Sequence, residues 1–194
     1  TGFRNFVERI QSSKRNLELT TEACLQDDQL LTYSFLESEQ MLPAGHNLHP
    51  FTKSRMGFSE EEQLLYGPEF RKGFQLDYFL IHKDCITEKS LLGISAKEIF
   101  QKWVSIPESY DFENINDFYI VPCHPWVAQY LLSTEEYPEM LGSGKIIHIG
   151  PLGDDFYATS SIRTVYNPDF SWMLKFSLHV LMTGSVRTNS LKDL

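Results

Sequence analysis

The stretch FYATSSIRTVYNPDFSWMLKFSLHVL, residues 156–181, decides the fold of this chain. It contains two runs rich in β-branched and aromatic residues, separated by the turn signal Asn-Pro-Asp at residues 167–169, and this pattern predicts a β-hairpin. In the second run apolar and polar residues alternate, so the apolar set is expected to face the core. We therefore predict strands over residues 156–166 and 171–181.

The expected register places a basic pair on one face of this hairpin. Matching apolar residues across the two strands predicts that Arg163 lies opposite Lys175 and that Ser161 lies opposite Ser177. Like charges that face each other on neighbouring strands destabilise a sheet, and an anion bound between them removes that cost. Arg offers a bidentate fork and Lys a point charge, and both suit phosphate or carboxylate. The alternative is a solvated face on which each cation pairs with an acidic neighbour.

The segment TGSVRTN, residues 183–189, follows the second strand and combines a glycine turn, three hydroxyl side chains and a third cation, Arg187. Backbone N–H groups in such a turn can form an anion-binding nest. The spaced glycines and the Gly-Lys-Ser/Thr ending of a P-loop are missing, and an ordinary turn is the alternative. Taken together, the hairpin and this segment indicate a polyanionic ligand.

The remainder of the chain predicts helices mixed with further strands. Residues 3–40 are typical of helix, and capping boxes at Ser59 and Ser95 each begin a short helix. Another helix is expected over 126–132, with strands over 74–82, 118–121 and 145–149. The fold class predicted is α+β, with a helical N-terminal part over residues 1–44 and an antiparallel sheet flanked by helices over residues 45–194.

The chain of 194 residues is acidic, with 17 Lys and Arg against 26 Asp and Glu and a net charge of −9. A nucleic-acid binder needs a basic face, so nucleic acid is excluded as a general partner. Three cysteines without a Cys-x-x-Cys motif predict free thiols in a reducing compartment, the cytoplasm. No apolar run approaches the ~20 residues of a membrane helix. The chain starts without Met and stops soon after a polar loop, so we expect part of a longer protein.

A second basic segment, GHNLHPFTKSRMGF, occupies residues 45–58. Zinc needs its histidines on one helical turn with further ligands, which the Pro and Gly here disfavour, so no metal site is expected. The functional interpretation is an anion clamp in which His49 and Lys53 face a phosphate or a carboxylate. The alternative is a loop whose histidines bond to the backbone. His124 precedes a helix and is interpreted as a structural contact at its N-terminus.

Five segments in the same order resemble motifs of the siderophore synthetases that are independent of non-ribosomal peptide synthetases, the IucA/IucC family. They are GHNLHPFTKSRMGF, VPCHPWVAQYLL, TSSIRT, LKFSL and TGSVRT. Asn47 replaces a usual Pro, and Val127 stands where Gln is common. The resemblance implies the thumb and fingers parts of a cupped-hand fold whose palm is missing. It leaves a homodimer open.

The resemblance also implies an ATP-dependent carboxylate–amine ligase. Citrate or a derivative would be activated as an acyl-adenylate and condensed with an amine, hydroxylamine or alcohol. By motif position, Ser161, Arg163 and Thr164 would contact the nucleotide phosphates. Lys175 would stabilise the phosphate charge, and Thr183 and Arg187 would hold phosphate or the carboxylate substrate. His49 and Lys53 would close the phosphate side. The candidate catalytic residues are Lys175, Arg187 and His49. The carboxylates that bind Mg²⁺ would lie in the absent C-terminal domain, so this chain alone is expected to be inactive. A phosphotransferase of another family and a non-catalytic fragment that binds an anion or a partner are the alternatives.

Overall fold

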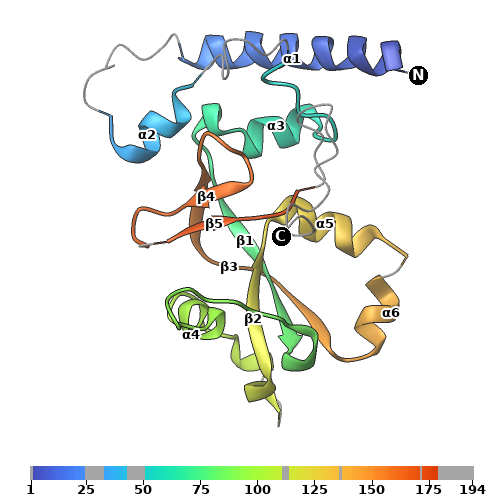
Figure 1. The fold of residues 1–194 in the computed structure, drawn as a ribbon, viewed down its shortest axis with the longest axis vertical. Helices are drawn as coiled ribbons and strands as arrows, with labels where there is room; N and C mark the ends of the chain where they lie inside the picture. The colour runs from blue at the N-terminus through green and yellow to red at the C-terminus, as the bar shows by residue number, and fades with distance from the viewer. Residues whose placement is uncertain are drawn as a thin grey trace. The chain divides into compact units, whose positions relative to one another are not determined.

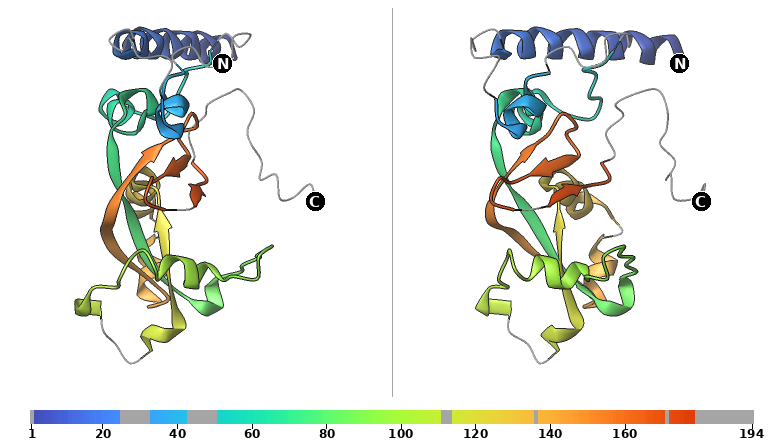
Figure 2. Two further views of the ribbon diagram at one scale, coloured as in Figure 1. Left: turned by 90° about the vertical axis from the view of Figure 1, so that its left-hand side faces the viewer. Right: turned by 60° about the vertical axis from the view of Figure 1, so that its left-hand side comes forward.

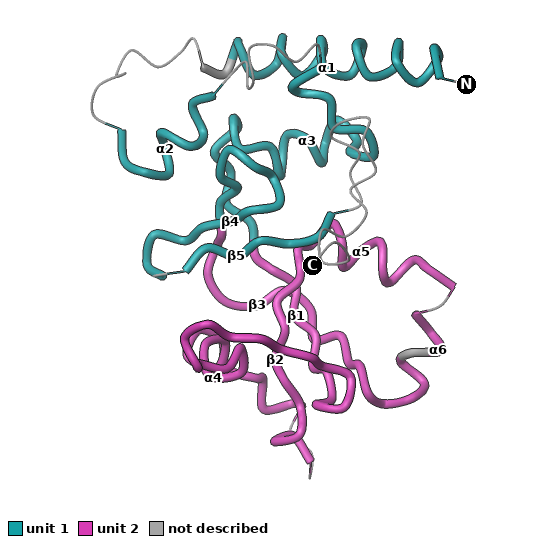
Figure 3. Tube along the Cα trace, viewed as in Figure 1, with its two compact units in different colours: residues 1–74, 157–194 teal, residues 75–156 magenta. Residues whose placement is uncertain are grey.

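The computed structural model describes residues 2–24, 33–42, 51–110, 114–135, 137–170 and 172–178. The chain divides into two compact units, residues 1–74 with 157–194 and residues 75–156, which have different colours in Figure 3. The domain boundary expected near residue 44 lies within residues 43–50, outside the described residues. That boundary therefore stays a prediction.

Five strands form one sheet with the order β2-β1-β3-β4-β5 (Figure 1). They are β1 (Gly73–His82), β2 (Phe118–Cys123), β3 (Ile146–Ala158), β4 (Thr164–Tyr166) and β5 (Met173–Lys175). The pairings of β1 with β2, β3 with β4 and β4 with β5 are antiparallel. Helices accompany this sheet, so the predicted α+β class is confirmed.

The first unit carries three helices. The first two lie within residues 1–44, which were predicted to be helical, and the third begins at the predicted capping box of Ser59. They are α1 (Gly2–Cys24), α2 (Phe35–Gln40) and α3 (Glu60–Tyr66). The predicted capping box at Ser59 is present, because the Ser59 hydroxyl accepts from the N–H of Glu62 and the Glu62 carboxylate accepts from the N–H of Ser59. A 3₁₀ turn, η1 (Pro68–Phe70), contacts all three helices. It is therefore the point at which this unit's helices meet.

The second unit packs helices against β1 and β2. Its helices are α4 (Ala96–Phe100), α5 (Pro125–Ser133) and α6 (Tyr137–Gly142), with 3₁₀ turns η2 (Lys83–Cys85), η3 (Glu108–Tyr110) and η4 (Ile115–Asp117). Leu76, Tyr78 and Leu80 alternate along β1 as fully buried side chains, which is the period-two pattern of a strand with one face in a core. A second cluster joins Phe79 to residues of α5 and α6.

The predicted hairpin exists, but its strands and register differ from the prediction. Residues 156–166 are not one strand, because β3 ends at Ala158 and β4 begins at Thr164 (Figure 2). Between them the chain turns, and the two strands pair with Tyr157 opposite Tyr166. The turn expected at residues 167–169 is present, since the Asn167 side-chain oxygen accepts from the N–H of Asp169 at 2.8 Å.

Local hydrogen bonds, one of them from a hydroxyl side chain, explain why residues 156–166 do not form one strand. The Thr159 hydroxyl donates to the carbonyl of Thr164 at 2.9 Å, and the N–H of Thr164 donates to the carbonyl of Ser161 at 2.9 Å. Such local bonds compete with a strand ladder. Ile162 lies in this turn and is fully buried. The alternation counted across the turn therefore had the wrong phase.

Candidate functional site

Four of the residues expected to contact a nucleotide lie on β4, on β5 or in the turn before β4, and we call Ser161, Arg163, Thr164 and Lys175 the hairpin group. Thr164 lies opposite Lys175 in the ladder, so their side chains share one face. Val165 lies opposite Leu174 on the other face, and Val165 is completely buried. Thr164 and Lys175 therefore stand on the face away from the Val165 core.

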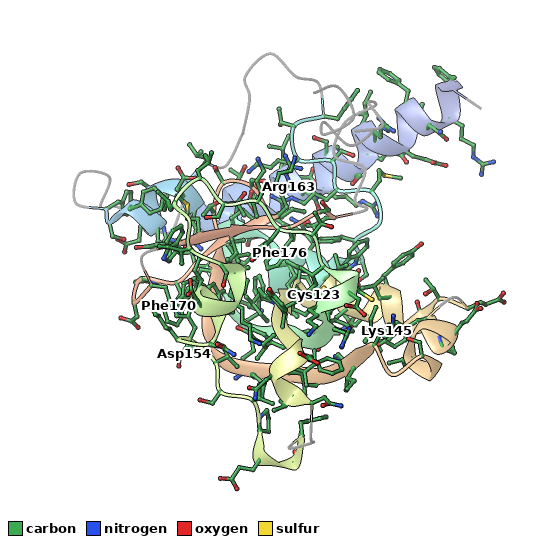
Figure 4. The ribbon with its side chains drawn as sticks, turned by 60° about the horizontal axis from the view of Figure 1, so that its bottom comes forward. Cys123, Lys145, Asp154, Arg163, Phe170 and Phe176 are labelled. Atoms are coloured by element: carbon green, nitrogen blue, oxygen red, sulfur yellow. The ribbon has the colours of Figure 1, made fainter. Side chains whose placement is uncertain are left out.

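The predicted pairing of Arg163 with Lys175, and of Ser161 with Ser177, is wrong. The ladder is displaced by one residue, and the carbonyl of Arg163 accepts from the N–H of Phe176 at 2.7 Å. Figure 4 labels the side chains of Arg163 and Phe176. Because the two cations are not directly opposite, their repulsion across the strands does not arise. No anion is therefore needed to offset repulsion between these cations, and an anion site here requires that the groups be exposed.

Exposure differs within the hairpin group. Lys175 is exposed, whereas Ser161, Arg163 and Thr164 are half-buried. Among the described residues Lys175 has no acidic side chain within ion-pair distance. A cation in this setting keeps its charge available for a ligand, which is what a phosphate contact requires.

Helix α2 holds the turn that contains Ser161. The Glu39 carboxylate accepts from the hydroxyl of Ser160 at 2.6 Å and from its N–H at 3.2 Å. The Gln40 side chain donates to the carbonyl of Ala158 at 3.0 Å. These bonds fix the start of the turn, so α2 holds the backbone just before Ser161.

Lys53 lies in a different setting, which we call the buried charge cluster of Lys53, Arg55 and Glu69. The Lys53 ammonium contacts the Glu69 carboxylate and donates to the carbonyl of Leu42 at 2.6 Å. One guanidinium nitrogen of Arg55, Nη2, lies 2.8 Å and 3.1 Å from the two oxygens of Glu69. All three side chains are buried. The expected contact of Lys53 with a phosphate has no support in this geometry and stays a prediction.

Charge sets the ionisation of Glu69. Burial by itself raises the pKa of this carboxyl, but the positive charges of Arg55 and Lys53 and their hydrogen bonds outweigh burial and hold the pKa below its ordinary value of 4.5. The carboxylate is therefore ionised at neutral pH. The sequence had no signal for Glu69, because nothing in Gly67-Pro68-Glu69 links it to residues 53–55.

Three predicted site residues, His49, Thr183 and Arg187, lie outside the described residues. Their placement stays a prediction. His124 is described, and the prediction of a structural contact is confirmed: its side chain accepts from the N–H of Trp126 at the start of α5. Burial lowers the pKa of His124 to about 3, so the ring is neutral at physiological pH.

The second unit contains an Asp–His pair that nothing in the sequence predicts. His148 Nε2 lies 2.6 Å from an oxygen of Asp77, and Asp77 is opposite Cys123 in the ladder. Burial, and then the charge of Asp77, raises the pKa of the Cys123 thiol to about 12. A thiol that stays protonated is a poor nucleophile.

The described ranges contain no cluster of three His, Cys, Asp or Glu side chains that could hold a metal ion. They also contain no helix with the length and apolar character needed to cross a membrane.

This chain belongs to the IucA/IucC family, whose model matches residues 34–194, and the predicted resemblance is confirmed. A spermidine-citrate ligase of Bacillus anthracis is 38% identical over 96% of this chain and 32% of that protein. The rhizobactin siderophore biosynthesis protein RhbC of Rhizobium meliloti (strain 1021) is 36% identical over 100% of this chain and 34% of that protein. The chain thus spans about a third of the length of these relatives.

A solved structure is similar to nearly the whole chain. The ATP-bound aerobactin synthetase IucA from a hypervirulent pathotype of Klebsiella pneumoniae has a TM-score of 0.81 and 29% identity. The match covers 98% of this chain and 34% of that chain. The arrangement of helices and strands described above is therefore a part of the IucA/IucC fold.

Proposed function

We propose that this chain is the nucleotide-binding part of an ATP-dependent siderophore synthetase. The enzyme activates a carboxylate, citrate or a citrate derivative, and condenses it with an amine, hydroxylamine or alcohol. The observation that carries the proposal is the likeness of almost the entire chain to a synthetase solved with ATP bound. The citrate ligase and the siderophore biosynthesis protein among its relatives support the same substrate class.

The proposed reaction has two steps. A carboxylate oxygen of the acid attacks the α-phosphorus of ATP, the bond from that phosphorus to the bridging oxygen breaks, and pyrophosphate leaves. The amine nitrogen then attacks the acyl carbon, AMP leaves with the C–O bond electrons, and the nitrogen loses a proton as the amide forms. The first nucleophile is already ionised, so this step needs no general base.

Electrostatic stabilisation is the main requirement of the first step. Attack of a carboxylate on a polyphosphate brings two anions together, and fixed cationic and N–H donors offset their repulsion. In the hairpin group, Lys175 is exposed and without an acidic partner among the described residues, and Thr164 shares its face. We assign Lys175 to the phosphate charge, and Ser161, Arg163 and Thr164 to nucleotide contacts.

The residues outside the described ranges complete the proposed site. His49, Thr183 and Arg187 are assigned to phosphate or carboxylate contacts on their motif positions. Mg²⁺ neutralises polyphosphate charge when bound, and its carboxylate ligands are assigned to the part of the synthetase beyond this chain. The chain alone is therefore expected to lack activity.

The proposal is tested by hydroxamate formation with the full-length enzyme, ATP and hydroxylamine across a panel of carboxylates that includes citrate and succinate. Product with citrate, together with release of AMP and pyrophosphate, is the expected result. Release of ADP would favour a phosphotransferase. No product with any acid, and ATP affinity unchanged by Arg163→Ala and Lys175→Ala, would favour a non-catalytic fragment.

A further inference from the structure

The first unit contains a cavity of about 520 Å³ that the proposed nucleotide site does not use. It is lined by α1 between residues 12 and 19, by Arg55 and Phe58, and by Ser59, Glu60 and Gln63 at the start of α3. Ligand cavities in proteins commonly span roughly 300–1,000 Å³, so this space suits a small molecule.

Two buried polar side chains in its lining have unused hydrogen-bonding atoms. Arg55 is 4% exposed and Gln63 is 2% exposed. Nη1 of Arg55 and both side-chain heteroatoms of Gln63 have no hydrogen-bond partner among the described residues. Buried polar groups are nearly always bonded, and exceptions ask for an explanation such as an absent ligand. Here a guanidinium donor and an amide with both a donor and an acceptor line the same cavity.

The surrounding structure holds these groups in place. Nη2 of Arg55 is bound to the Glu69 carboxylate, which fixes the plane of the guanidinium. Helix α1 is tied to the adjoining segment, because the Asn16 side chain donates to the carbonyl of Lys53 at 2.6 Å and the Ser13 hydroxyl accepts from the N–H of Lys53 at 3.3 Å. The elements that line the cavity are therefore held to one another.

Charge around the cavity is of both signs. Exposed Arg15, Glu18 and Glu60 line it together with the buried guanidinium of Arg55. A polyphosphate would meet two carboxylates here, and an apolar ligand would leave the Arg55 and Gln63 atoms unbonded. A molecule with a carboxylate at one end and an ammonium at the other matches both the buried and the exposed groups.

We propose that this cavity binds a small zwitterion of the amino acid class. The ligand carboxylate accepts from Arg55 Nη1 and from the Gln63 amide, and its ammonium lies towards the carboxylates of Glu18 and Glu60. The proposal goes beyond the proposed function, because the cavity lining contains none of the residues assigned there to the nucleotide or to the reacting carboxylate.

The test is calorimetric titration of the full-length protein, without ATP, with L-lysine as the probe. Hexanoate, which lacks the ammonium groups, and cadaverine, which lacks the carboxylate, are the matched fragments. Lysine is expected to bind at least about tenfold more tightly than either fragment, since each fragment leaves one set of charged groups unpaired. Absence of saturable lysine binding, or equal binding of lysine and a fragment, overturns the proposal.

Variants locate the binding in this cavity. Gln63→Leu removes the amide at nearly the same size and is expected to weaken lysine binding about tenfold while the melting temperature is retained, because it removes a buried group that is already unbonded. Glu60→Gln is expected to weaken binding severalfold, whereas Glu61→Gln, at a neighbouring exposed position outside the cavity lining, leaves it unchanged. If Gln63→Leu fails to fold, the Glu60 and Glu61 pair still decides. Lysine binding that Glu60→Gln does not change overturns the assigned site.

Discussion

The buried charge cluster and the hairpin group use the same kinds of basic residue in opposite ways. Lys53 and Arg55 are buried and share the Glu69 carboxylate, whereas Lys175 is exposed without an acidic partner among the described residues. Both belong to motifs of the IucA/IucC family, and sequence alone assigned Lys53 and Lys175 to the same chemistry. The difference teaches that a cation within a motif is a ligand contact only if the fold leaves its charge unpaired.

The largest effect is expected from breaking the buried charge cluster. Glu69→Gln leaves Lys53 and Arg55 buried without their counter-charge, which is expected to lower the free energy of unfolding by about 3–5 kcal/mol. Denaturant unfolding of the variant measures this loss. Glu61→Gln is the control, because this exposed carboxylate on α3 is outside the cluster. A loss no larger than that of the control would mean that the cluster is not a stabilising unit.

The opposite result is expected in the hairpin group. Lys175→Gln should lower kcat of the full-length enzyme by about 10²–10³, the usual loss when one donor to developing charge is removed. Its free energy of unfolding should change by less than about 0.5 kcal/mol, because the side chain is exposed. Lys72→Gln, an equal loss of charge at another exposed position of the same unit, is the control and should keep full activity. Equal kcat in the two variants would remove Lys175 from the site.

Acid should weaken the buried charge cluster. Because the pKa of Glu69 is lower in the folded protein than its ordinary value of 4.5, its contribution to stability is complete above that value. Below pH 4.5 the carboxyl of Glu69 binds a proton more readily in the unfolded chain than in the folded protein. The contribution to stability is therefore lost as the pH falls from 4.5 through the folded-state pKa. Thermal unfolding measured from neutral to acid pH should show a smaller acid loss for Glu69→Gln than for the unchanged protein. Parallel pH profiles would contradict this assignment.

The smallest loss of stability is expected when a helix-capping hydroxyl is removed. Ser59→Ala removes the hydroxyl that accepts from the N–H of Glu62 at 3.1 Å, and a loss of about 1 kcal/mol in the free energy of unfolding is expected. Ser95→Ala removes the same bond to Glu98, also 3.1 Å long, in the second unit. Denaturant unfolding should give similar losses for both, each well below that of Glu69→Gln. A loss as large as that of Glu69→Gln would show that the start of α3 and the cluster are coupled.

Sequence patterns predicted the structure correctly where it depends on hydrogen bonds between residues close together in the chain. The capping boxes at Ser59 and Ser95, the turn at residues 167–169 and the contact of His124 with α5 were all predicted correctly. Each depends on groups two or three residues apart, whose geometry is nearly independent of the rest of the fold. The ordered motifs likewise sufficed to identify the family.

Contacts between distant residues could not be predicted in the same way. The hairpin register failed because the hydroxyl-bonded turn after Ala158 removed five residues from the expected strand, and a displacement of one residue changes every cross-strand pair. The unbonded atoms of Arg55 and Gln63 depend on how α1 and α3 enclose them, which no spacing encodes.

By itself, then, the sequence determined the α+β class, the family and the short-range caps and turns. Only the tertiary structure decided which cations are neutralised and which stay exposed, because Glu69 reaches Lys53 and Arg55 across more than a dozen residues of chain. Ion pairing depends on distance in space and on burial, and neither is a property of spacing along the chain.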